Sequence, residues 1–211
     1  MSIVIKAPSG GGSISLDTQQ SVTGDHTLQL PTGVGSAGQV LKNSSTAGTL
    51  EFAQGGKILQ VVQSSKTDVD SITGASFQNI GLSVSITPSS ATSKVLIFVY
   101  ATISSDNGSY DMKLRLMRGT TPLSVGDAAS NRPRASTNIS NSWASGVWGS
   151  ANAAINFLDS PATTSQVTYK LQAMAYGATY NIYINRGPND TDLAGYEARS
   201  ASSMIAMEVE A

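Results

Sequence analysis

The stretch "LSVSITPSSATSKVLIFVYATI", from Leu82 to Ile103, contains two different hydrophobic patterns separated by a polar turn. In the first part, Leu82, Val84 and Ile86 alternate with Ser or Thr, as expected for a β-strand with one buried and one solvated face. Pro88 and the Ser and Thr residues around it predict a turn. The second part is apolar at nearly every position. We therefore expect two strands of a β-sandwich, the second covered on both faces.

Strand-like segments of this kind recur from Gly56 to Ala211. Gly, Asn, Asp or Pro residues separate them, and none shows helical periodicity. The segments are residues 57–65, 75–88, 93–105, 110–118, 151–160, 166–176, 179–186 and 202–210. Only 13 % of the residues are charged, which suits short strands and polar turns better than helices. We predict an all-β fold, an antiparallel jelly-roll β-sandwich.

The apolar segment within residues 93–105 also predicts an oligomer. Its large apolar residues fall on both faces of the expected strand. The outer face of a two-sheet sandwich is normally polar, so an apolar outer face indicates contact with another subunit. The candidate interface residues are Val95, Leu96, Ile97, Phe98, Val99 and Tyr100.

Residues 1–55 differ from the rest of the chain. Short alternating pieces such as "SIVIK" and "SISL" are separated by turns rich in Gly and Ser, and each piece offers only a few large apolar side chains. Their burial barely offsets an ordering cost of about 1–2 kcal/mol per residue. We predict an N-terminal β-arm or stalk that orders against copies of itself or a larger assembly, followed by a head domain at residues 56–211. The candidate anchoring residues are Ile3, Val4, Ile5, Ile14 and Leu16.

Charge and composition argue against several classes of protein. The formal net charge is -1 without a block of like sign, so we expect no nucleic-acid partner. The chain has no cysteine, which excludes disulfides and thiolate metal sites. The most apolar segment, Val95 to Ile103, is about half as long as a membrane span, so we expect no membrane insertion. The N-terminal apolar run is too short for a signal peptide.

The stretch "LPTGVGSAGQVL", residues 30–41, has the G-x-G-x-x-G spacing of a dinucleotide-binding turn at Gly33, Gly35 and Gly38. The context does not fit, because Pro31 separates the turn from the preceding strand and no amphipathic helix follows. We interpret the glycines as a turn between arm strands and expect no cofactor.

Catalytic motifs are weak. His26 is the only histidine, it lies in the predicted arm, and no G-x-S-x-G turn is present. Asp106 and Asp111 flank one loop, and Asp190 and Asp192 lie in another, where carboxylates are usually solvated turn residues. A calcium loop starting at Asp190 would have alanine at two ligand positions. We therefore expect neither an enzyme nor a metal site.

The polar segment at residues 130–150 is the candidate recognition site. Trp143 and Trp148 could offer flat apolar faces to a glycan, and Arg132 and Arg134 could donate hydrogen bonds to it. The alternative is that the two tryptophans pack at a subunit interface or over the edge of the sandwich.

The N-terminal pattern "HTLQLPTGVGSAGQVLKNSSTAGTLEFA" resembles a module of bacteriophage tail fibres and other virion surface proteins. Blocks such as "GKILQVVQSS", "GLSVSITPSSATSKVLIF" and "SSMIAMEVEA" look like the globular domain that follows that module. The resemblance covers nearly the whole chain. It implies a homotrimeric head, similar to the tumour-necrosis-factor-like jelly roll, that an N-terminal segment attaches to the particle.

We therefore expect a structural protein of the virion surface, made in the host cytoplasm. The chain is short for a tail fibre, so a capsid decoration protein or head fibre is as compatible with the sequence as a tail fibre. Its expected partners are further copies of itself, a phage capsid or tail protein bound through the arm, and a host-surface glycan. Two alternatives stay open: a carbohydrate-binding adhesion module outside phages, and a glycan depolymerase, which normally has a longer repetitive β-helix.

Overall fold

The computed structural model describes residues 3–6, 13–16, 28–107, 111–140 and 149–210. In this part of the chain, strands are joined by turns and loops, and no helix occurs. The chain divides into two compact units, Met1–Gly55 and Gly56–Ala211. The division falls where the short, Gly-rich segments give way to long strands.

Among its described residues, the first unit contains two antiparallel strand pairs. β1 (Ile3–Lys6) pairs with β2 (Ser13–Leu16), and β3 (Gln39–Asn43) pairs with β4 (Leu50–Gln54). The strand expected just before Pro31 is absent in its described part, where Gln29 forms only an isolated parallel bridge to Thr49. Pro31 follows at once, and it has no N–H with which to continue a ladder.

In its described residues, the second unit contains the eight strands that the sequence predicts and three more. The strands are β5 (Ile58–Lys66), β6 (Asp70–Thr73), β7 (Gln78–Ile86), β8 (Lys94–Ser105), β9 (Met112–Arg118), β10 (Thr121–Leu123), β11 (Thr137–Ile139), β12 (Ala151–Asp159), β13 (Val167–Met174), β14 (Asn181–Ile184) and β15 (Ser202–Val209). The additional strands β6, β10 and β11 have only three or four residues each, and β14 is likewise shorter than the predicted segment 179–186.

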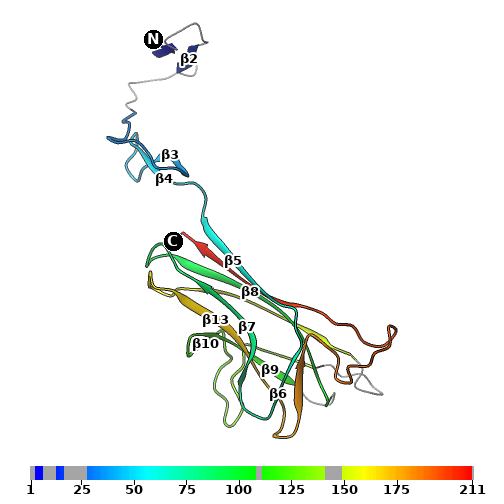
Figure 1. Ribbon diagram of the computed structural model, residues 1–211. Coiled ribbons are helices and arrows are strands. Elements are labelled where there is room, and N and C mark those ends of the chain that lie inside the picture. Colours follow the sequence, from blue (N-terminus) through cyan, green and yellow to red (C-terminus); the bar gives the residue numbers. More distant parts are fainter. Residues whose placement is uncertain (1–2, 7–12, 17–27, 108–110, 141–148, 211) are drawn as a thin grey trace, which may run out of the picture. The chain divides into compact units, whose positions relative to one another are not determined.

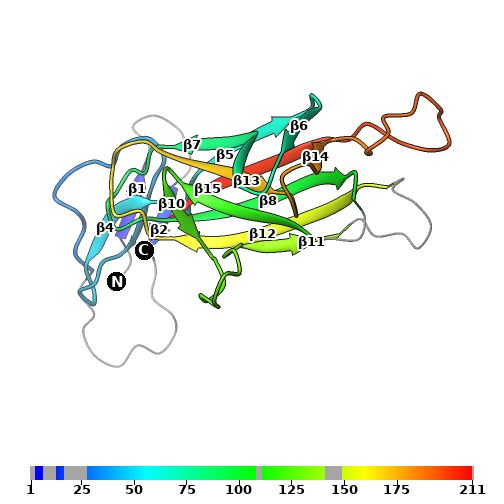
Figure 2. The ribbon, with the colours of Figure 1, turned by 90° about the horizontal axis from the view of Figure 1, so that it is seen from below.

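These strands form two antiparallel sheets (Figures 1 and 2). One has the order β10-β9-β13-β7, with β11 also on β9, and the other has the order β5-β15-β8-β14-β6, with β12 also on β8. The predicted all-β antiparallel class is confirmed. The jelly-roll connectivity stays a prediction, with which this strand order is compatible.

The core lies between the two sheets. Both contribute fully buried side chains, among them Ile97 and Met204 from one sheet and Leu116 and Leu171 from the other. Alternation along each strand turns every second side chain inward.

Within β8, Val95, Ile97 and Val99 belong to this core and are at most 3 % exposed. Their assignment to an oligomer interface is therefore wrong, because their side chains are already covered by the opposite sheet. Only the alternate residues of β8 can meet another molecule.

Asn185 joins β14 and β15, the two strands that pair with the same edge of β8. They occupy different parts of that edge, because β12 pairs with the opposite edge. Asn185 is completely buried with φ +61°, a backbone conformation that asparagine tolerates better than most residues. Its Nδ2 donates to the carbonyls of Lys66 and Asp68, and its Oδ1 accepts from Ser202 Oγ at 2.6 Å. Its backbone N–H donates to the carbonyl of Thr102.

Asp159, the last residue of β12, links the two sheets. It is 5 % exposed, and both its carboxylate oxygens accept from Arg118 Nη1 at 2.8 Å. Its Oδ2 also accepts from the hydroxyl of Tyr169 at 2.7 Å. Burial and the neighbouring carboxylate raise the pKa of Tyr169, so this hydroxyl stays a donor.

Glu208, on β15, holds the turn between β7 and β8. It is completely buried, and its carboxylate accepts from the backbone N–H and hydroxyl of Ser89 and from Gln60 Nε2. Burial acts to raise the pKa of Glu208, but hydrogen bonds from Ser89, Gln60 and Ser93 outweigh it and lower the pKa to about 2. β15 thus fixes the turn at residues 87–93 ("TPSSATS"), which separates the two strand patterns within Leu82 to Ile103.

Replacing Asp159 should destabilise the sandwich. In Asp159→Ala, the hydroxyl of Tyr169 and part of the Arg118 guanidinium lose their partner while buried, which should lower the free energy of unfolding by about 3 kcal/mol. Tyr169→Phe removes one donor and leaves the ion pair, so it should cost about 1 kcal/mol. Urea unfolding at one protein concentration measures both variants. Equal losses of unfolding free energy in the two variants would contradict a central role for the Asp159 carboxylate.

Acid should weaken the Glu208 contacts. The folded pKa lies below the usual 4.5, so the stability from this group is full above pH 4.5 and declines as the pH falls toward about 2. This loss should reach about 3 kcal/mol at the acid end. Glu208→Gln should be less stable than the natural protein at pH 6, and the difference should shrink at pH 3. Urea unfolding at the two pH values measures it, and a pH-independent difference would contradict this assignment.

Candidate functional site

The outer face of the sheet that contains β8 is apolar across four strands. The cross-strand register places Val61, Met207, Leu96 and Leu158 in one row, from β5 through β15 and β8 to β12. In the next row, Ile205 and Phe98 lie side by side. We call this surface the apolar face; it comprises Val61, Leu96, Phe98, Tyr100, Leu158, Ile205 and Met207.

Several of these side chains face solvent in the single chain. Val61 is 55 % exposed, Leu158 47 %, Tyr100 46 % and Phe98 41 %. The structure thus keeps Leu96, Phe98 and Tyr100 as candidate interface residues and adds neighbours from β5, β12 and β15. Alternation within "ILQVVQSSK" and "SSMIAMEV" could not reveal these neighbours, because only the strand order brings the segments together.

The outer face of the opposite sheet is mainly polar, with Met117 and Met174 among its outward positions. On β7, β9 and β13 the outward positions include Asn79, Ser83, Arg115, Lys170 and Gln172, while the alternate positions enter the core. We call this surface the polar face. No single segment predicts this surface, although "MKLRLMR" and "VTYKLQAM" carry basic or amide residues at alternate positions. The two outer faces of one sandwich therefore differ in chemistry.

The described residues 28–55 of the first unit bury no large apolar side chain. Leu28, Leu30, Val34, Val40 and Leu41 are all exposed. A groove of about 760 Å³ runs between residues 29–34 and 49–52. Such a surface is typical of a segment that needs a partner for stability.

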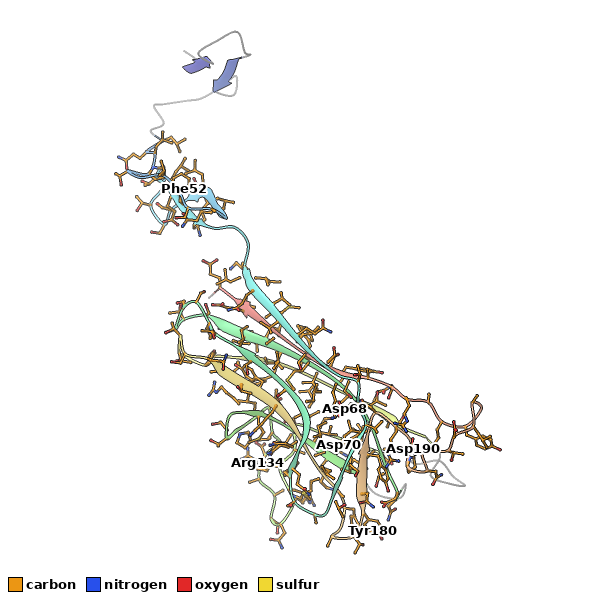
Figure 3. The ribbon with its side chains drawn as sticks, in the orientation of Figure 1. Phe52, Asp68, Asp70, Arg134, Tyr180 and Asp190 are labelled. Atoms are coloured by element: carbon orange, nitrogen blue, oxygen red, sulfur yellow. The ribbon has the colours of Figure 1, made fainter. Side chains whose placement is uncertain are left out.

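The glycines of the nucleotide-like motif help to shape this unit. A Cβ on Gly35 would lie 2.6 Å from Phe52 Cδ1, so the aromatic ring (labelled in Figure 3) requires a glycine there. Gly38 has φ +85° at the turn into β3. The positive φ of Gly38 and the packing of the Phe52 ring against Gly35 explain two of the three glycines, and neither reason involves a bound nucleotide.

The predicted anchoring residues lie in the strand pair of β1 and β2. Ile3 pairs with Leu16, Val4 with Ser15, and Ile5 with Ile14. Their role in attachment stays a prediction.

The candidate recognition residues are only partly described. Arg132 and Arg134 lie in the exposed loop between β10 and β11, where Arg134 Nε donates to the carbonyl of Gly126 at 2.6 Å. Trp143 and Trp148 lie outside the described residues, as does His26. Figure 3 shows Arg134 on a different side of the second unit from Asp190.

Three of the four loop carboxylates singled out in the sequence, Asp106, Asp111 and Asp190, are engaged in local structure. Asp106 accepts from the backbone and side-chain nitrogens of Asn181, and Asp111 accepts from Asn138 Nδ2. Asp190 forms an ion pair with Arg199 at 2.7 Å. These hydrogen bonds and this ion pair stabilise the local loop structure, as expected for turn residues.

The loop between β14 and β15 also encloses a cavity of about 460 Å³ lined by Asp190, Arg199 and neighbouring residues. Glu197 closes this loop by accepting from the backbone N–H groups of Asn189 and Thr191. Within the described ranges, no three His, Cys, Asp or Glu side chains gather as metal ligands would. Nor does any helix long and apolar enough to span a membrane occur there.

Comparisons with known proteins add no family. Neither a protein-family model nor a curated protein matches this chain.

Proposed function

We propose that the chain is a structural protein of a bacteriophage particle, in which three copies associate through the apolar face and residues 1–55 attach them to the capsid or tail. The observation that carries the proposal is the apolar row Val61–Met207–Leu96–Leu158 on the outside of the sandwich. The resemblance to virion surface proteins supplies the setting and the number of copies.

A second copy of the chain is the simplest cover for the apolar face. The opposite outer face carries amides, hydroxyls and basic groups, so the sandwich does not need apolar residues on its outside to fold. Burial of aligned apolar side chains between copies stabilises an assembly by about 25 cal/mol per Å². In a closed threefold ring, each copy contacts its neighbour through two different parts of its surface, so the apolar face of each copy would turn toward the threefold axis.

The first unit supports the attachment role. Its described apolar side chains are exposed, and its groove of about 760 Å³ includes Leu30, Val34 and Phe52. Three tethered copies would bind a particle with avidity, because each attached arm raises the effective concentration of the others. The mechanism is therefore association. The engaged carboxylates Asp106, Asp111 and Asp190 agree with a role without catalysis.

A charge placed on the apolar face should dissociate the trimer. Leu96→Glu would bury one unpaired carboxylate per copy, at a cost of several kcal/mol each, whereas Ser83→Glu places the same charge on the polar face. Light scattering coupled to size exclusion at about 10 µM should find three chains for the natural protein and Ser83→Glu, and one for Leu96→Glu.

Far-UV circular dichroism verifies that Leu96→Glu keeps its β-structure. A natural protein that elutes as one chain would overturn the trimer. Cryo-electron microscopy of purified particles tests the location: density for the head on capsid or tail would support it, and particles that lack the chain would contradict it.

A further inference from the structure

The polar face concentrates positive charge in a chain whose net charge is -1. Strands β7, β9 and β13 contain Lys113, Arg115, Arg118 and Lys170, and no Asp or Glu. Arg118 is neutralised by Asp159, which leaves Lys113, Arg115 and Lys170. One carboxylate, that of Asp111, lies two residues before Lys113, and it accepts from Asn138 Nδ2.

Three side chains form a hydrogen-bonded row across this face. The register places Arg115, Gln172 and Asn79 side by side on β9, β13 and β7. Arg115 Nη2 and Nε donate to Gln172 Oε1 at 2.9 and 3.3 Å, and Gln172 Nε2 donates to Asn79 Oδ1 at 3.0 Å. The guanidinium also lies 4.0 Å from the centroid of the Phe77 ring, which supports it from one side.

The direction of these bonds decides what the row can bind. At the two ends of the row, the amide of Asn79 and Nη1 of Arg115 carry N–H groups that no bond within the row uses. A row that offers donors and a positive charge is complementary to an acceptor-only anion. A carboxylate is such a group, and it matches the planar guanidinium.

A shallow hollow of about 180 Å³ adjoins the row. It is lined by Asn79, Gly81, Leu82, Ser83 and Lys170. The hollow lies where Gly81 has no side chain and where the pairing of β7 with β13 shifts register between Lys170 and Gln172. Lys170 therefore borders an indentation in an otherwise continuous sheet surface.

On the β7 side, Gly81 adjoins Lys66, whose ammonium would lie 3.0 Å from a Cβ at position 81. That ammonium is paired with Asp68 at 2.6 Å and lies 3.9 Å from Asp70, and Figure 3 shows the two aspartates near each other. This cluster holds one positive and two negative charges, so it adds no positive charge to the polar face and repels an anion on the β7 side. The positive charges that can meet an anionic ligand are therefore those of Arg115 and Lys170, with Lys113 at the far end.

We propose that the polar face binds an acidic polysaccharide whose sugar rings carry carboxylates, with Arg115, Asn79 and Lys170 as its contacts. An extended chain suits a flat sheet face with a shallow hollow better than a compact ligand that needs a deep pocket. Hydroxyls of the sugar rings meet Ser83 and the amide of Asn79. Single-stranded nucleic acid fits less well, because its sites use exposed aromatic faces for stacking and Arg115 already covers a face of Phe77.

This inference goes beyond the proposed function, since the apolar face and the arm can assemble the particle while the polar face stays bare. It assigns the contact with the host to the polar face instead of the loop that contains Arg132 and Arg134. Trimer formation and polysaccharide binding use opposite faces of the sandwich. A failure of one is therefore distinguishable from a failure of the other.

Isothermal titration of the full-length natural protein with oligogalacturonate tests the proposal. At about 50 mM salt we expect binding, which should weaken at about 300 mM, and no binding of neutral dextran. Arg115→Gln and Lys170→Gln should each weaken binding by about tenfold, because each removes a charge-assisted contact. Arg115→Lys should lose most of the same affinity, because it keeps the charge and loses the planar fork.

Lys57→Gln is the matched control, because it removes the same charge from an exposed lysine that precedes β5. It should bind as the natural protein does. Equal weakening in Lys57→Gln would show general charge attraction and overturn the proposal. Absence of oligogalacturonate binding would also overturn it, as would equally tight binding of single-stranded DNA. Circular dichroism and light scattering on each variant show whether fold and assembly are retained.

Discussion

The inward face of β8 is the constraint on which the other features of the second unit depend. Val95, Ile97 and Val99 are sealed by the opposite sheet, while β12, β14 and β15 pair with the two edges of the strand. Because side chains alternate, sealing one face commits Leu96, Phe98 and Tyr100 to the outside. The apolar face is a direct consequence of a strand that is apolar on both sides, combined with a second sheet that can cover only one of them.

Buried polar groups then determine how the sheets and turns meet. Asp159 connects β12 to residues of the opposite sheet, Glu208 holds the turn between β7 and β8, and Asn185 joins the strands along one edge of β8. Each of these side chains forms hydrogen bonds to specific partners in the folded chain. Each therefore favours this arrangement of sheets and turns over others in which the buried group would have no partner. The two outer faces differ, one being apolar and the other carrying amide and basic groups. On this difference rest our two proposals, assembly through the apolar face and ligand binding on the polar face.

The sequence predicted much of the fold and less of the candidate sites. Eight strands were recognisable because their segments, with flanking residues, show alternation or an apolar run, whereas β6, β10 and β11, with three or four residues each, were not recognised. Leu96 and Phe98 were recognised as interface candidates because they lie on a single strand. Val61, Leu158 and Met207 were not, because they come from strands far apart in the chain. The Arg115–Gln172–Asn79 row was missed for the same reason, since its members meet only across three strands.

By itself, the sequence determined that the chain forms strands, because periodicity is a local property of neighbouring residues. It also determined that the first 55 residues lack the large apolar side chains of an independent core. Only the tertiary structure decided which face of β8 enters the core, which strands border it, and where Glu208 and Asp159 find their partners. The physical reason is that these contacts join residues far apart in the chain. The residue pattern of one strand carries no information about the strand that will lie beside it.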